Sequence, residues 1–510
     1  MVENEYIIGK IVNISALFTV KIHIVKAINL KKQYRLHKLE EIFMKKRIVS
    51  AIMAGTMVAS LAACSPSPEA PATPAETKAA GETKAAAETQ VAAETQAAAE
   101  TQAAAAASED ANTLTVYAWD KNFNIPALQA AEADYQKNVN PDFKLNIVEQ
   151  SQSSDVENAV TLAGSAGDYS TLPDIVLFQD HYFKKYVTDF PDAWASFEGA
   201  DIDWNDFGAE KLSYSTIDGV HYGMPVDNGT VIFAYRTDLL EQAGYTIDDM
   251  KGISWDEWIE IGKKVYDTTG KYLLSMDGDG NDLPYMMLQA EGVSQFKDGD
   301  INLSENETFK KIIDVIVRGA KENVIYLAND WSDYTDQTIV GDMVAGVMNG
   351  NWIIPTIQQV ADNSGKWEIT SMPTLEGNGK EGFASNGGSS LYITSNCQNL
   401  ELAQDFLGKT FGAGSTETYD AALKNGGVIT CSAKAGQSAV YNEGVEYFNN
   451  TPVYAEIVKM SANVPVVEQS DYHYPTRTQV AAAIQNIING ADADASIKDA
   501  EDQVRFAMQG

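Results

Sequence analysis

The sequence predicts an α/β protein with two lobes, each built on an open sheet. Strands and helices alternate from about residue 113 onward, which is typical of an open α/β sheet. The chain has 510 residues, of which 45% are hydrophobic, and this is enough for two lobes with buried cores. Residues 222–258, a polar turn followed by an apolar strand and two helices, are the segment that we expect to cross between the lobes.

The charge and the cysteines exclude two classes of protein. Lys and Arg number 37 and Asp and Glu number 71, so the formal net charge is −34. We expect no nucleic-acid partner, because binding polyphosphate requires a cationic face. Three cysteines are too few for a disulfide-dense scaffold. Cys397 and Cys431 either pair or remain free thiols, and the sequence leaves both possibilities open.

The chain before residue 64 has the composition of a targeting segment. A basic run at 44–47 and an apolar run at 48–63 have the features of a secretory signal peptide. Residues 1–43 lack an apolar run near the ~18 residues of a spanning helix. We expect translation to begin at Met44, which would make 1–43 a non-native extension; a longer signal beginning at Met1 is the alternative.

An anchor and a tether are expected to follow the signal. Residues 61–64, Leu-Ala-Ala-Cys, resemble a bacterial lipobox, which implies cleavage before Cys64 and a lipid on its thiol. Residues 64–111 contain no aromatic side chain and repeat a Glu-Thr unit every six residues. Such a segment cannot build a core, so we expect a disordered tether. The protein would then be anchored at the extracellular face of the bacterial cell membrane.

In the first lobe, side chains that follow the predicted strands gather at one rim. We expect strands at 113–119, 144–148 and 174–178, with helices at 125–135 and 155–166 between them. Ligands of open α/β sheets bind beyond the carboxyl ends of the strands. The candidate binding residues at this rim are Trp119, Asp120, Gln179, Asp180 and His181.

The crossing segment carries the starts of two helices. A β-branched and aromatic strand at 231–235 precedes Asp238 and Glu241, which have the spacing of a capping box. Ser254 and Glu257 repeat this spacing before a second helix. The two tryptophans of that helix recur at helical spacing, so we expect them in the core.

These crossing residues resemble a known family. The run from Pro225-x-Asp227 through a strand ending in Tyr-Arg at 235–236, then Asp-Leu-Leu-Glu-Gln-Ala-Gly-Tyr and Trp-Asp-Glu-Trp, resembles the extracellular solute-binding proteins of carbohydrate ABC importers, the maltose-binding-protein-like group. The resemblance covers about residues 112–510. It implies a two-lobed periplasmic-binding-protein-like fold of type II with a multi-strand hinge, no catalytic activity and no cofactor.

The resemblance also divides the chain between the lobes. The expected first lobe is 112–225 with about 388–428, and the expected second lobe is about 226–387 with 429–510. In the second lobe we expect helices near 306–323 and 336–343, and a last helix pair after 477. A strand at 344–348 should lead into a turn at 349–351.

Further candidates follow from the chemistry of sugar recognition and from the resemblance. Sugars are held by aromatic faces against their C–H surfaces and by planar polar groups that bond neighbouring hydroxyls. Trp352 ends a Gly-x-Trp stretch whose tryptophan, in the family that it resembles, faces the ligand. Tyr472 and Tyr474 lie where that family commonly carries a cleft aromatic. The remaining candidates are Asp227, Asn228, Trp331, Asp333, Asn351, Gly388 and Arg477.

No metal site is expected. Asp277, Asp279 and Asn281 resemble the start of a calcium loop, but Asp282 and Leu288 occupy the positions where Gly and Glu are needed. A turn is therefore the better interpretation. The histidines after Cys64, which have no metal-ligand spacing, are His181, His221 and His473.

The sequence therefore predicts a monomeric, lipid-anchored receptor that captures a saccharide, expected to be an oligosaccharide, for the permease of an ABC importer. One alternative is a binding protein for a non-sugar solute, either a peptide or a polyamine, since polyamines also bind aromatic rings beside acids. The other is a glycoside-processing enzyme in which Asp180 and Asp227 act as acid and base.

Cys64→Ser is expected to release the protein from the membrane, because a serine cannot take the thioether-linked lipid of a lipobox cysteine. Comparing the membrane fraction with the medium by immunoblot measures this. A serine variant that stays as firmly membrane-bound as the parent would contradict the anchor.

Overall fold

The fold is given by a computed structural model, which describes residues 108, 110–121, 123–277 and 282–509. The expected extension, the signal peptide, Cys64 and nearly all of the tether lie outside the described residues, as does most of the calcium-like motif that begins at Asp277. Within the described part, no helix has both the length and the apolar character needed to cross a bilayer.

One mixed sheet of eight strands extends through the described part of the chain, in the order β12-β7-β14-β3-β1-β2, with β13 beside β7 and β4 beside β14. Strand β1 pairs in parallel with β2 and β3, while the pairs of β7 and β14 are antiparallel. The strands are β1 Thr113–Ala118, β2 Lys144–Glu149, β3 Ile175–Gln179, β4 Trp194–Ala195, β7 Gly223–Arg236, β12 Gly346–Gly350, β13 Trp367–Thr370 and β14 Ser385–Thr394.

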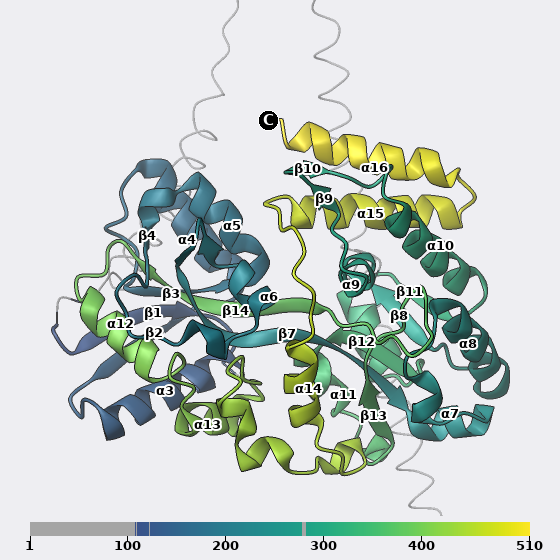
Figure 1. The fold of residues 1–510 in the computed structure, drawn as a ribbon, viewed down its shortest axis with the longest axis horizontal. Coiled ribbons are helices and arrows are strands. Elements are labelled where there is room, and N and C mark those ends of the chain that lie inside the picture. Colours follow the sequence, from purple (N-terminus) through teal and green to yellow (C-terminus); the bar gives the residue numbers. More distant parts are fainter. Residues whose placement is uncertain (1–107, 109, 122, 278–281, 510) are drawn as a thin grey trace, which may run out of the picture. The chain divides into compact units, whose positions relative to one another are not determined.

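Strands β7 and β14 run side by side through the middle of the fold and connect its two parts (Figure 1). The first half of β7 pairs with β14, and its second half pairs with β12 and β13. All 14 residues of β7 are buried. The strand predicted at 231–235 is therefore confirmed, but it begins at Gly223, because the polar residues before 231 also have ladder partners.

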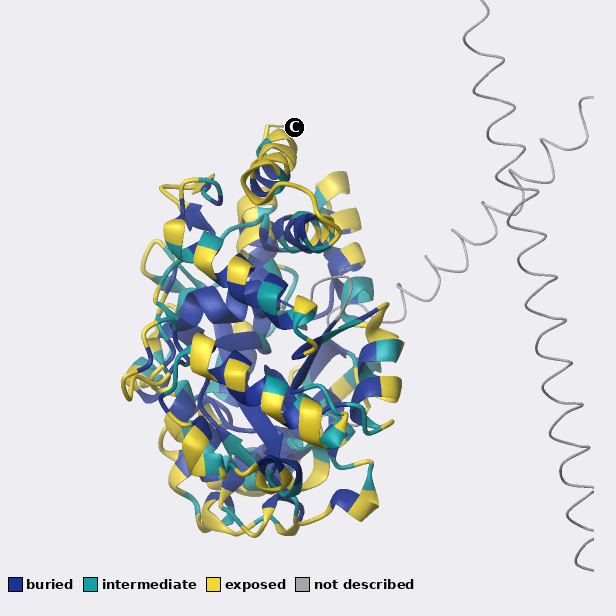
Figure 2. Cartoon of the chain, turned by 90° about the vertical axis from the view of Figure 1, so that its right-hand side faces the viewer, coloured by how far each residue is buried: buried dark blue, intermediate teal, exposed yellow. Residues whose placement is uncertain are grey.

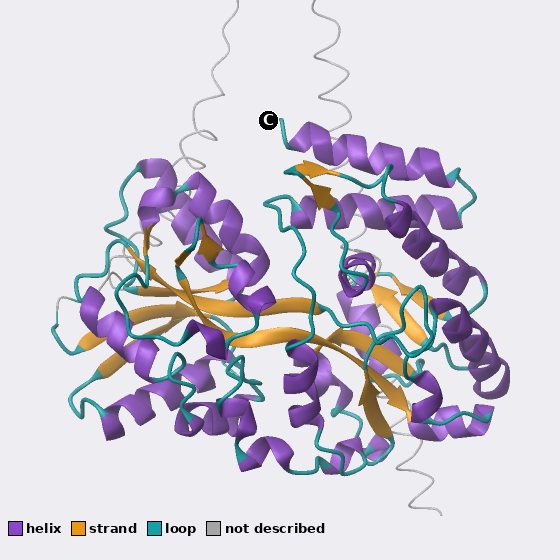
Figure 3. Ribbon diagram, viewed as in Figure 1, coloured by secondary structure: helices purple, strands orange, loops and turns teal. Residues whose placement is uncertain are grey.

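The first lobe, as we name it, consists of β1–β4 and the helices packed on them. Helices cover both faces of this part of the sheet (Figure 3), and their apolar sides form two buried clusters with the strands. All five strands and helices predicted here are confirmed to within a few residues. The helices are α3 Asn124–Asn138, α4 Ser153–Ala166, α5 Asp180–Asp189, α6 Ala209–Ser213, α12 Leu400–Lys409 and α13 Thr416–Gly426.

The second lobe consists of β12, β13, the separate parallel pair β8 Leu274–Asp277 and β11 Ile325–Ala328, and the helices around them. Figure 2, viewed from this side, shows helices with buried inner and exposed outer faces. Trp255 and Trp258 are in the core, as predicted. The helices are α7 Thr237–Ala243, α8 Trp255–Thr269, α9 Leu283–Ala290, α10 Glu307–Lys321, α11 Ile354–Ile357, α14 Val453–Ser461, α15 His473–Ile488 and α16 Ala493–Ala507.

One of the two predicted capping boxes is present. Ser254 Oγ accepts a hydrogen bond from the Glu257 amide at 3.2 Å, and Glu257 Oε2 accepts one from the Ser254 amide at 2.8 Å. The prediction for Asp238 is wrong. Both of its carboxylate oxygens accept hydrogen bonds from the Arg236 guanidinium, at 2.7 and 2.8 Å, and α7 has no side-chain cap. A buried guanidinium needs a paired carboxylate, and this need takes precedence over capping.

Two predictions near the second-lobe rim also need correction. The helix expected at 336–343 is a π-helical segment, Asp333–Ile339. The turn expected at 349–351 begins later, because Asn349 and Gly350 still pair with β7.

Cys397 and Cys431, whose pairing the sequence did not determine, are both free thiols.

Candidate functional site

A cavity of about 1120 Å³ lies between the two lobes, over the crossing strands. The first lobe contributes residues that follow β1 and β3, and the second contributes residues that follow β12 or project from α15. The predicted residues that line it are Trp119, Asp120, Gln179, Asp227, Trp331, Trp352, Gly388, Tyr474 and Arg477. Those that do not line it are Asp180, His181, Asn228, Asp333, Asn351 and Tyr472.

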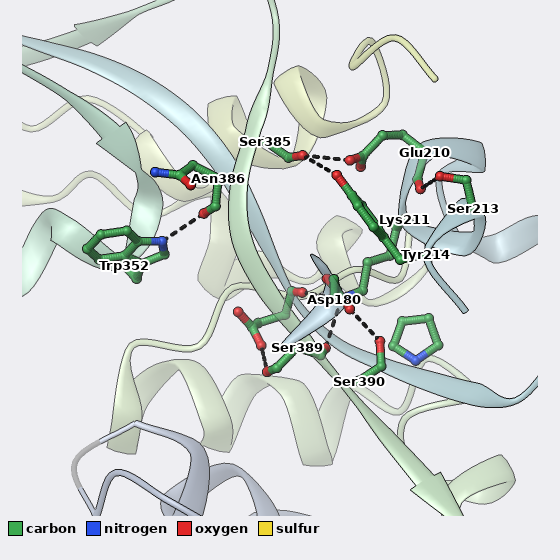
Figure 4. Close-up of polar contacts among 12 residues, drawn as sticks. Asp180, Glu210, Lys211, Ser213, Tyr214, Trp352, Ser385, Asn386, Ser389 and Ser390 are labelled. Atoms are coloured by element: carbon green, nitrogen blue, oxygen red, sulfur yellow. Dashed lines mark hydrogen bonds and ion pairs between the residues drawn. The ribbon is translucent and has the colours of Figure 1, made fainter. Parts of the chain in front are cut away.

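Asp180 lies beneath the floor of the cavity in a buried ion pair. The Lys211 ammonium donates to Asp180 Oδ2 at 2.5 Å and to the backbone carbonyls of Asp227 and Ser389, both at 2.8 Å (Figure 4). Ser390 Oγ donates to the other Asp180 oxygen at 2.9 Å. Burial raises the pKa of the Asp180 carboxyl, and the Lys211 charge opposes that rise. Both Asp180 oxygens are thus bonded within the protein, and the side chain is buried away from the cavity.

The structure also explains why the other five predicted residues do not line the cavity. Asn228 neighbours Asp227 on β7, and adjacent strand residues point to opposite faces, so only one of them lines the cavity. Asp333 accepts bonds from the backbone and side chain of Asn329, at 2.9 and 2.7 Å. Asn351 is buried, and Tyr472 packs against the second-lobe core. His181 is buried at the edge of the cavity, against a histidine of the other lobe.

Trp352 is held in one orientation at the second-lobe rim. Its indole N–H donates to the Asn386 carbonyl of β14 at 2.8 Å (Figure 4). A Cβ atom on Gly350 would lie 2.3 Å from the indole nitrogen, so only glycine allows the ring to lie here. The Trp331 ring lies 5.9 Å from that of Trp352 and is 45% exposed. Two aromatic faces thus lie next to each other at this rim.

The cavity also contains amides that the sequence analysis missed. Asn386 Nδ2 donates to Asn349 Oδ1 at 2.8 Å, and Asn349 Nδ2 donates to the Tyr334 hydroxyl at 3.1 Å. Asn386 directly precedes the Gly387-Gly388 pair, so its neighbours pointed to it. Asn349 was assigned to the turn at 349–351 and was not chosen as a binding residue, and Lys211 gave no sequence signal at all.

The charges in the lining are paired or acidic. Arg477, the cation among the lining residues, lies 3.3 Å from Asp282, which also lines the cavity. Burial raises the pKa of the Asp227 carboxyl, while Lys211 and a hydrogen bond from Ser389 oppose the rise. The described residues contain no cluster of His, Cys, Asp and Glu that would hold a metal ion. This lining suits a neutral, hydroxyl-rich molecule better than an anion.

Comparison with known proteins identifies relatives over most of the chain. The family model described as bacterial extracellular solute-binding protein matches residues 130–449. The lactose-binding protein of Rhizobium radiobacter is 32% identical over 400 residues, which cover 78% of this chain and 94% of that protein.

Solved structures share the fold at lower identity. The sugar-binding protein MalE of Xanthomonas citri matches with a TM-score of 0.64 and 16% identity, over 78% of this chain and 97% of its own. The galacto-N-biose-/lacto-N-biose I-binding protein of Bifidobacterium longum matches with a TM-score of 0.62 and 17% identity, over 79% and 98%. The predicted two-lobed periplasmic-binding-protein-like fold is confirmed.

Lys211→Met is expected to lower the free energy of unfolding by about 3–5 kcal/mol, because it leaves a buried carboxylate and two carbonyls without their donor. Urea denaturation of the whole chain measures this. Lys434→Met is the control, since Lys434 pairs with Asp203 at the surface at 2.8 Å, and a solvent-exposed ion pair contributes little to stability. Equal losses for the two variants would contradict the role given to Lys211.

Proposed function

Because the chain belongs to the bacterial extracellular solute-binding protein family, we propose that it is a lipid-anchored receptor that captures an oligosaccharide between its lobes. It is the carbohydrate-binding component of an ABC importer, and the similar galacto-N-biose-/lacto-N-biose I-binding protein is likewise that of an ABC transporter. The family is not catalytic, so the acid and base pair considered for Asp180 and Asp227 is not proposed. Burial of Asp180 supports the same conclusion.

The observation that carries the proposal is the placement of aromatic rings on both sides of the cavity. Trp119 comes from the first lobe, and Trp331 and Trp352 come from the second. The lining also contains planar polar groups such as Gln179 and Asn386. Rings that cover C–H surfaces, with amides that bond pairs of hydroxyls, are what a saccharide requires.

The size of the cavity supports a ligand longer than a single sugar. Its volume of about 1120 Å³ lies just above the roughly 300–1,000 Å³ typical of small-molecule sites. A ligand that reaches both lobes binds best when they are close together, so its differential affinity shifts the population toward the closed form. We propose that the permease recognises this form.

A thermal-shift screen tests the proposal, with lactose as the first probe because the Rhizobium radiobacter relative is named for it. A ligand present at 100 times its Kd should stabilise the native state by about 2.7 kcal/mol. Maltose and longer oligosaccharides test the length, and spermidine tests the polyamine alternative. Stabilisation by spermidine without any response to saccharides would reject the proposed ligand class.

Trp352→Ala is expected to weaken saccharide binding far more than it weakens the fold. Loss of a stacking face should cost about 1–3 kcal/mol, or roughly ten- to hundred-fold in Kd. Trp258→Ala is the control, since a fully buried tryptophan should instead cost about 3–5 kcal/mol of stability. Calorimetric titration and melting of both variants separate the two roles. A Trp352→Ala protein that melts early but binds normally would make Trp352 a core residue.

A further inference from the structure

Two stacked pairs of rings join the lobes along one wall of the cavity. His181 of α5 stacks on His473 of α15, with 4.2 Å between ring centroids and 6° between planes. The next residues, Tyr182 and Tyr474, stack at 4.2 Å and 18°. The Tyr474 hydroxyl also donates to Gln179 Oε1 at 3.2 Å. We call the four stacked rings the interlobe clasp.

The two histidines of the clasp have different electrostatic surroundings. His473 Nε2 lies 3.2 Å from Asp282 Oδ1, so the His473 ring has a carboxylate beside it. The His181 ring is buried, and no carboxylate among the described residues bonds to its nitrogens. The titratable and charged groups around it are His473, Tyr474 and Arg477 of α15, Asp282 and Tyr285 at α9, Glu210, Lys211 and Tyr214 at α6, and Asp180 of its own helix.

A proton on His181 is therefore unfavourable while the clasp is closed. Burial holds the pKa of His181 well below its usual range, the facing His473 lowers it further, and Asp282 only partly offsets these effects. When the lobes separate, the ring meets water and its pKa returns toward about 6.5.

We propose that His181 and His473 are positioning residues for ligand capture, which hold the lobes at the closed spacing at neutral pH and release them in acid. They act through lobe spacing and do not themselves line the cavity. Because the open form binds one more proton, each pH unit below about 6.5 shifts the closing equilibrium up to tenfold toward the open form. The effect on lobe spacing does not depend on the proposed function, whereas the effect on sugar affinity does.

Small-angle X-ray scattering of the whole chain without added sugar, at about pH 7.5 and about pH 5.5, tests the lobe spacing. The parent should expand in acid. His181→Phe keeps a ring for stacking but cannot take a proton, so it should not expand. His221→Phe is the matched control, because His221 stacks on Trp204 at 4.0 Å within the first lobe, and it should expand like the parent. A parent that does not expand, or a His181→Phe protein that expands equally, would overturn the proposal.

Calorimetric titration with lactose adds a second readout. The parent's Kd should rise severalfold, by up to about tenfold, between the two pH values, and that of His181→Phe should stay within about twofold. Expansion in acid without any lactose binding would support the clasp while rejecting lactose as the sugar. If His181→Phe melts well below the parent, His473→Phe replaces it, and it should reduce the expansion because the facing His473 contributes to the lowered pKa of His181. A His473→Phe protein that expands in acid as much as the parent would overturn the proposed role of the His181–His473 pair.

Discussion

The buried ammonium of Lys211 holds together the segments on which the cavity is built. Its three bonds reach the start of α5 through Asp180, strand β7 through Asp227 and strand β14 through Ser389. A charge taken out of water is tolerated only when its partners and its remaining hydrogen bonds are satisfied, and here they are. The floor of the cavity is thus fixed at the point where both crossing strands leave the first lobe.

The aromatic rim depends on the same crossing strands. Trp352 belongs to the second lobe, but its indole is bonded to Asn386 on β14. Gly229 of β7 packs closely against Asn386. A Cβ atom on Gly229 would lie 2.1 Å from the Asn386 carbonyl oxygen. The crossing strands β7 and β14 therefore position the Trp352 ring directly, while Trp119 moves with the first lobe. Relative motion of the lobes changes the distance between the faces that a sugar would touch.

The periodic parts of this fold could be predicted from the sequence because hydrophobic spacing reports directly on burial. The individual site residues were harder to predict, because a position at the rim of a sheet does not determine which way the side chain points. Gln179 and Asp180 are adjacent at the end of β3, yet α5 begins at Asp180 and directs its carboxylate beneath the floor of the cavity. Its partner Lys211 lies on the short helix α6 and is distant in sequence. Nothing in the local pattern of either residue indicates the pair.

The clasp illustrates how weak an interlobe contact must be for capture to work. Each stacked pair contributes about 0.5–1.5 kcal/mol beyond the area that it buries, so two pairs bias closing by only a few kcal/mol. A much stronger contact would keep the lobes closed and the cavity inaccessible, whereas without one a ligand would have to supply the whole free energy of closing. Tyr182 and Tyr474 both join the lobes and line the cavity. A ligand beside them adds its own contacts to a nearly balanced equilibrium, and one proton on His181 changes that equilibrium by a comparable amount.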